Sequence, residues 1–154
     1  MVSKMTNIVE ILGDLVGINT ANPPGNEKGI VDYITKRYGD YFKYDVINHT
    51  NERCSLHIGY HKDKELNVGL VGHIDTVQIG NLEEWNSNPF QLTKIGEDIY
   101  AGRGVSDMKS GVTVMLMLLD DIKAGILEPE YNLDLYFTAG EEVGVVVLDI
   151  DEER

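Results

Sequence analysis

The sequence has little cysteine, few basic residues and no long hydrophobic run. Its single cysteine, Cys54, cannot form an internal disulfide, which excludes a disulfide-stapled small protein and favours a reducing, cytoplasmic location. The longest apolar stretch, Val112–Leu119, contains Thr113 and is far shorter than the roughly 20 residues that a membrane span needs. The first residues lead into an amphipathic segment, so they predict no export signal. We therefore expect neither a transmembrane helix nor a membrane partner.

Basic residues are outnumbered two to one by acidic ones. Thirteen Lys and Arg against 26 Asp and Glu give a formal net charge of −13, which repels phosphate backbones and attracts cations. Nucleic acid is therefore not an expected partner. With 154 residues, of which 42% are hydrophobic, the chain is long enough and apolar enough to form one globular domain with a buried core.

Hydrophobic periodicity predicts three helices, separated by a proline-rich turn and by strands. The helices cover Ile8–Val16 with Thr6 or Asn7 as cap and Gly17 as stop, Glu27–Tyr38 with Asn26 as cap and Gly39 as stop, and Val112–Ile122 with Gly125 after its end. The turn is Asn22–Asn26. Alternating patterns predict strands at Lys43–Asn48, Arg53–Gly59, Leu66–Gly72, Phe90–Lys94, Asp98–Ala101 and Asn132–Thr138. This order indicates a layered α/β domain whose functional loops lie at strand ends.

Polar side chains that could carry chemistry follow these predicted strands. His73 and Asp75 are two residues apart, so in a continuing strand they share a face and Asp75 can orient the imidazole. Asp107 follows a glycine loop and opens a helix, where it either bridges cations or caps the helix. Glu141 and Glu142 are adjacent carboxylates whose repulsion a cation would relieve. Taken singly, each of these features also fits a surface turn, a helix cap or a solvated acidic loop.

Together, one imidazole and several carboxylates form a ligand set that suits a divalent cation such as zinc. Two such ions close together can polarise a carbonyl and lower the pKa of a water, while a neighbouring Glu takes its proton. This chemistry is metal-assisted amide hydrolysis. A nucleotide-binding domain is a weaker alternative, because Asp107 stands where the third glycine of a dinucleotide loop would be.

The motifs resemble, in order and separation, the zinc-dependent aminoacylase family that includes acetylornithine deacetylase, succinyl-diaminopimelate desuccinylase and glutamate carboxypeptidase. The matching segments are Asn19–Glu27, Gly69–Val77, Glu84–Trp85 with Asn88–Phe90, Gly102–Lys109 and Thr138–Glu142. The resemblance implies a helix-sheet-helix catalytic domain of the zinc-peptidase type that hydrolyses amide bonds in N-acyl amino acids or small peptides. It also implies two zinc ions, with cobalt or manganese as alternatives.

The resemblance further implies a role for each candidate residue. His73, Asp107 and Glu142 are implied as metal ligands, with Asp107 bridging two ions. Asp75 and Glu141 are implied as catalytic residues, Asp75 orienting the site and Glu141 acting as general base. The peptide bond between Asp107 and Met108 is implied to be cis.

Members of this family are longer, and their two further metal ligands and their lid or dimerisation domain would lie beyond Arg154. We therefore expect residues 1–142 to be the N-terminal part of a truncated catalytic domain. Residues 143–154 are expected to form an atypical tail, in which the β-branched run at Val143–Leu148 favours a strand. An alternative function is a catalytically silent remnant that binds cations weakly or self-associates as a homo-oligomer through an exposed sheet edge.

Overall fold

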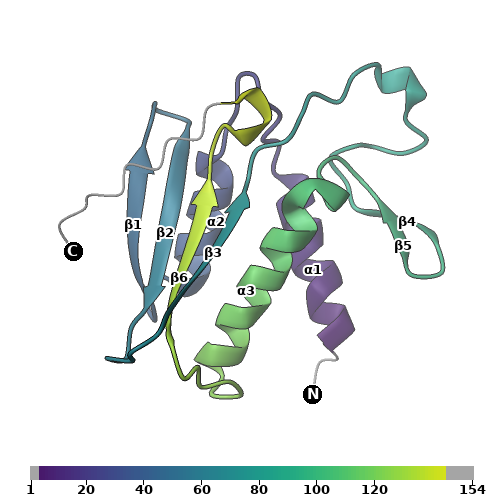
Figure 1. Cartoon of the computed structure of the whole chain (residues 1–154). Helices are drawn as coiled ribbons and strands as arrows, with labels where there is room; N and C mark the ends of the chain where they lie inside the picture. The colour runs from purple at the N-terminus through teal and green to yellow at the C-terminus, as the bar shows by residue number, and fades with distance from the viewer. Residues whose placement is uncertain (1–3, 145–154) are drawn as a thin grey trace.

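The computed structural model describes residues 4–144, which form a four-stranded mixed sheet, a separate hairpin and three α-helices (Figure 1). The helices are α1 (Lys4–Gly17), α2 (Lys28–Tyr38) and α3 (Ser110–Lys123). The strands are β1 (Lys43–Asn48), β2 (Cys54–Tyr60), β3 (Asn67–His73), β4 (Thr93–Gly96), β5 (Ile99–Ala101) and β6 (Asn132–Thr138). Short helical turns cover Leu82–Glu84, Val105–Lys109 and Glu141–Val143.

All three predicted helices and all six predicted strands up to Thr138 are present, with shifted ends. The first helix begins at Lys4, so Thr6 and Asn7 lie within its bounds rather than at its start. The cap position of α2 is Glu27 rather than Asn26, and no side chain makes a capping hydrogen bond to this helix. The Glu27 carboxylate is paired with Arg53 at 2.9 Å. Gly125 follows α3 with a φ of 66°, as predicted for a glycine after a helix end.

Three further predictions need correction. Asp107 neither opens nor caps α3; it lies in the preceding irregular turn, and α3 begins at Ser110. The first hairpin strand begins at Thr93 instead of Phe90, because the Asn88 side chain accepts the Phe90 amide and closes a turn there. Val143 lies in a 3₁₀ turn rather than a strand. The rest of that predicted strand, residues 145–148, lies outside the described residues.

The four-stranded sheet has the order β1-β2-β6-β3. Neighbours β1 and β2, and β2 and β6, run antiparallel, whereas β3 and β6 run parallel. His73 pairs with Thr138 in the parallel register, so β3 and β6 end at the same edge of the sheet. The loops after these two strands therefore start side by side, which brings together segments more than 60 residues apart.

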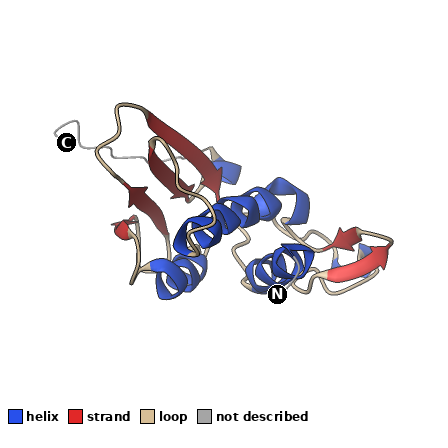
Figure 2. Cartoon of the chain, turned by 90° about the horizontal axis from the view of Figure 1, so that it is seen from below, coloured by secondary structure: helices blue, strands red, loops and turns tan. Residues whose placement is uncertain are grey.

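The core lies between one face of the sheet and the helices, and Figure 2 shows the helices gathered on one side of the sheet. Gly72 faces this side, where a Cβ would meet the side chains of Met108 and Met115 at about 3 Å. The Tyr38 hydroxyl of α2 donates a 3.0 Å hydrogen bond to the Leu116 carbonyl of α3, which ties the two helices together. No helix between residues 4 and 144 has the length and apolar character that crossing a membrane requires. The α/β fold predicted from the sequence is confirmed.

Candidate metal centre

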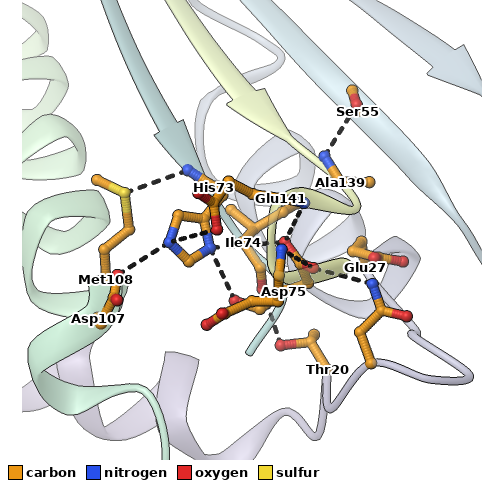
Figure 3. Close-up of polar contacts among 12 residues, drawn as sticks. Thr20, Glu27, Ser55, His73, Ile74, Asp75, Asp107, Met108, Ala139 and Glu141 are labelled. Atoms are coloured by element: carbon orange, nitrogen blue, oxygen red, sulfur yellow. Dashed lines mark hydrogen bonds and ion pairs between the residues drawn. The ribbon is translucent and has the colours of Figure 1, made fainter. Parts of the chain in front are cut away.

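His73, the last residue of β3, lies at the centre of the polar cluster in Figure 3 and is only 7% exposed. Its Nδ1 atom lies 3.1 Å from the backbone carbonyl oxygen of Asp75, and its Nε2 atom lies 2.9 Å from Asp107 Oδ1. Because a carbonyl oxygen only accepts, Nδ1 carries the proton, and Nε2 is the nitrogen that can coordinate a metal.

Asp75 is fully buried just beyond the end of β3 and holds the site together. Its Oδ1 accepts the Glu141 amide at 3.2 Å, and its Oδ2 accepts the Glu142 amide at 3.2 Å and the Asn22 side chain at 2.9 Å. Its Oδ1 also lies 3.5 Å from His73 Nδ1. One carboxylate thus links three segments of the chain.

These contacts shift the pKa values of both groups. Burial alone would raise the pKa of Asp75, but hydrogen bonds from His73, Asn22 and the Glu142 amide outweigh it and lower the pKa to about 2. The hydrogen bond to the Asp75 carboxylate raises the pKa of His73 to about 9. Burial alone would lower this pKa, and the hydrogen bond to Asp107 raises it further. Without a metal, the pair is therefore an imidazolium beside a carboxylate at neutral pH.

Asp107 reaches the cluster from the irregular turn Val105–Lys109 that precedes α3. Its side chain is 77% exposed, and the peptide bond to Met108 is cis, as the resemblance implied. The turn is anchored by Lys109, whose buried Nζ donates 2.8 Å hydrogen bonds to the carbonyls of Leu15 and Ile18 at the end of α1. Burial lowers the pKa of Lys109 to about 8.

Glu141 and Glu142 lie on the 3₁₀ turn after β6. Glu142 offers a carboxylate oxygen that lies within 4.8 Å of ligand atoms from both His73 and Asp107. Glu141 Oε2 lies 3.8 Å from His73 Nε2. The structure therefore brings all five candidate residues together, and His73, Asp107 and Glu142 could hold a metal ion. One imidazole nitrogen and two carboxylate oxygens match the ligands of a catalytic zinc site, which usually has three protein ligands.

Two residues that position this cluster were missed by the sequence analysis. The sequence predicts only a turn at Asn22, yet this residue is buried and donates to Asp75. In the sequence Lys109 is only the last residue of a matching motif, yet it anchors the turn that carries Asp107. Neither contact has a local signal, because the partners are 53 and 94 residues apart; the only hint was that both residues lie within the matching motifs.

Residues 69–148, a segment that includes His73, Asp75, Asp107, Glu141 and Glu142, match the peptidase family M20/M25/M40. The chain belongs to this family. This M20/M25/M40 chain is 31% identical to a probable succinyl-diaminopimelate desuccinylase of Staphylococcus aureus, over 87% of its own length and 32% of the relative. It is also 31% identical to an uncharacterised metallohydrolase of Methanocaldococcus jannaschii, over 88% of its own length and 37% of the relative.

Solved structures share the fold of this M20/M25/M40 chain. A metallo-carboxypeptidase of the M20 family from Sulfolobus solfataricus matches with a TM-score of 0.72 at 19% identity, over 94% of this chain and 32% of that one. Human carnosine dipeptidase 1 matches with a TM-score of 0.71 at 15% identity, over 86% of this chain and 31% of that one. The chain thus spans about a third of the length of these relatives and covers part of their catalytic domain.

Proposed function

We propose that this chain contributes to a zinc-dependent hydrolase that cleaves amide bonds in N-acyl amino acids or small peptides. The observation that carries the proposal is the convergence of His73, Asp107 and Glu142, whose ligand atoms lie within 4.8 Å of one another. Family membership supports it, because the chain belongs to a peptidase family and resembles a probable desuccinylase. Cobalt or manganese could replace zinc at such a ligand set.

Each side chain has a distinct role in this proposal. His73, Asp107 and Glu142 supply the metal ligands, with Asp107 shared between the two ions that the resemblance implies. Asp75 fixes the imidazole so that Nε2 faces the ligand cluster. Bound zinc would supply Lewis-acid chemistry at the amide carbonyl and lower the pKa of a water. Glu141 is half exposed and close to the cluster, so its carboxylate can take a proton from the attacking water and deliver it to the leaving nitrogen.

Calorimetric zinc titration of the purified chain tests the metal site. We expect micromolar or tighter binding that is lost in His73→Ala and Asp107→Ala. His61→Ala and Glu97→Ala are matched controls at exposed positions and should bind zinc like the parent chain. Equal zinc affinity in His73→Ala and the parent chain would refute the assignment.

A second pair of variants separates metal binding from catalysis. Glu142→Gln should weaken zinc binding, whereas Glu141→Gln should keep zinc affinity and lose amide hydrolysis on a panel of N-acetyl and N-succinyl amino acids. Unchanged turnover in Glu141→Gln would show that Glu141 is not the base.

A second candidate function is association through the sheet edge. Within residues 4–144, β3 has a paired neighbour on one side only, and Val71 on this strand is 58% exposed. An unpaired strand edge favours pairing with a strand of another chain, and a lysine on the edge strand disfavours that pairing. Light scattering should therefore show concentration-dependent dimers that Val71→Lys reduces. Val114→Lys, at a helical position that is 64% exposed, should leave them unchanged, and a monomer at every concentration would rule this function out.

A further inference from the structure

A buried serine on β2 contacts the chain at the point where β6 leaves the sheet. Ser55 is 1% exposed, and its Oγ atom accepts a 3.1 Å hydrogen bond from the backbone amide of Ala139, as Figure 3 shows. Ala139 is the first residue after β6, and the 3₁₀ turn that carries Glu141 and Glu142 begins at the next residue, Gly140. A side chain from a neighbouring strand thus fixes the backbone just before this turn.

The Ala139 amide needs this acceptor, because the strand pairing of β6 has ended before it. The last residue of β6 that pairs with β2 is Phe137, and the last that pairs with β3 is Thr138. Ala139 is only 3% exposed, so little water can reach it. A buried N–H group without an acceptor costs free energy, and native proteins rarely leave one unsatisfied. Without the Ser55 hydroxyl, we expect the chain after β6 to shift toward another acceptor.

His49, in the turn between β1 and β2, contacts the same hydroxyl. Its Nε2 atom lies 2.9 Å from Ser55 Oγ, and its own backbone amide donates a 2.9 Å hydrogen bond to the Arg53 carbonyl across the turn. A hydroxyl can accept one hydrogen bond and donate another. Because the Ala139 amide can only donate, all three groups are satisfied when Ser55 accepts from Ala139 and donates to Nε2 of His49. The imidazole thereby fixes the orientation of the serine.

The turn that carries the two glutamates is therefore held from two sides. Asp75 accepts the amides of Glu141 and Glu142 on the β3 side, and Ser55 accepts the amide of Ala139 on the β2 side. The Glu142 carboxylate has to stay within 4.8 Å of the other two proposed metal ligands. Functional groups must be held within about 0.5 Å of their working positions, so a small shift of this turn would weaken metal binding.

We propose that Ser55 and His49 are positioning residues, which fix the exit of β6 from the sheet so that Glu142 reaches the metal and Glu141 stays beside it. The proposal rests on the proposed function, because it acts through the two carboxylates that are assigned there to the metal and to the base. It extends the site to β2 and to the turn between β1 and β2, neither of which supplies a proposed metal ligand.

Calorimetric zinc titration of single variants is the first part of the test. Ser55→Ala should weaken zinc binding about tenfold, which corresponds to about 1.4 kcal/mol, and Ser55→Thr should restore most of the affinity because it keeps the hydroxyl. His49→Ala should cost less, about threefold, since the Ala139 amide keeps its acceptor. Ser87→Ala, at a half-buried serine outside the site, should bind zinc like the parent chain. Unchanged zinc affinity in Ser55→Ala would overturn the proposal.

A double-mutant cycle distinguishes positioning from a general loss of structure. Ser55→Ala is combined with Glu142→Gln, which removes the charged ligand through which Ser55 is proposed to act. The loss of zinc affinity caused by Ser55→Ala should then fall below about twofold. A loss of the same size in both backgrounds would overturn the proposal. His49→Ala, at a partly exposed turn position, enters the same cycle and decides the matter if Ser55→Ala does not fold.

A measurement without metal separates this proposal from the proposed function. In the ¹⁵N-labelled, metal-free chain, the amide resonances of Glu141 and Glu142 report the position of the turn. Ser55→Ala and His49→Ala should shift both resonances, Ser55→Thr should shift them less, and Ser87→Ala should leave them unchanged. Failure of the parent chain to bind zinc contradicts the metal centre, whereas the two resonances still decide whether Ser55 positions the turn. Resonances that stay at their parent values in Ser55→Ala would overturn the positioning role.

Discussion

Removing the Asn22 side chain should destabilise the metal-free protein, because Asn22 supports a buried charge. Asn22 is 4% exposed and Asp75 is fully buried, and the 2.9 Å bond between them is charge-assisted. Hydrogen bonds to charged groups contribute about 1.5–3 kcal/mol, so Asn22→Ala should lower the free energy of unfolding by that amount. With urea m-values of about 1–3 kcal/mol per molar, the unfolding midpoint falls by about 1 M.

Asn22→Asp is the sharper variant, since it places a second carboxylate against Asp75 where the amide donor was. Two carboxylates this close repel unless they share a proton, so the loss should exceed that of Asn22→Ala at pH 7 and shrink at acidic pH. Urea unfolding followed by circular dichroism, with chelator present, measures all variants. Asn86→Ala, at an exposed position, is the control. An Asn22→Ala loss under about 0.5 kcal/mol, typical of surface substitutions, would refute this account of Asp75.

Three further outcomes follow from the site and the core. Because the pKa of His73 is raised to about 9 and zinc must displace its Nε2 proton, apparent zinc affinity should rise about tenfold per pH unit from pH 6 to 8. Calorimetry in buffers of different ionisation enthalpy should show that about one proton is released for each zinc ion bound. A zinc affinity that does not change between pH 6 and 8 would contradict this prediction. Burial raises the pKa of the Cys54 thiol to about 11, so the native chain at pH 8 should react with a disulfide reagent far more slowly than the urea-unfolded chain; similar rates would show that the thiol is accessible. Gly104→Ala should cost more stability than Gly80→Ala in thermal unfolding. Both glycines have a positive φ, which costs a residue with a Cβ about 1–2 kcal/mol. Only at Gly104 would the new Cβ also clash with a neighbour, because it would lie 2.5 Å from the Thr76 side chain. Equal costs would show that the loop relaxes around the methyl group.

The sequence was sufficient to predict the elements, because hydrophobic spacing follows the helix and strand periods directly. The apolar residues from Ile11 to Val16 and the alternation of Leu133, Leu135 and Phe137 correspond to buried faces in the structure. The position of His73 and Glu141 at strand ends also followed from the pattern. That these ends adjoin depends on β6 pairing in parallel with β3, which periodicity does not encode.

The two helix caps that were predicted wrongly show competition between local and distant hydrogen-bond partners. Asn26 does not cap α2, because the cap position is Glu27 and backbone bonds such as Lys28 N–H to the Glu52 carbonyl hold that end. Asp107 does not cap α3, because the chain stays irregular until Lys109 is secured to α1. In both places a distant contact displaced the local preference that the sequence suggested.

The shared acceptor at Asp75 makes substitutions in separate segments non-additive. Asn22 donates from the turn after α1, and the Glu141 and Glu142 amides donate from the turn after β6, which begins at Gly140 with a φ of 86°. Asn22→Ala and Gly140→Ala each disturb donors to one carboxylate, so the double variant should show a coupling free energy that distant, independent sites lack. Whether a substitution is tolerated in one of these segments therefore depends on which residues are present in the other.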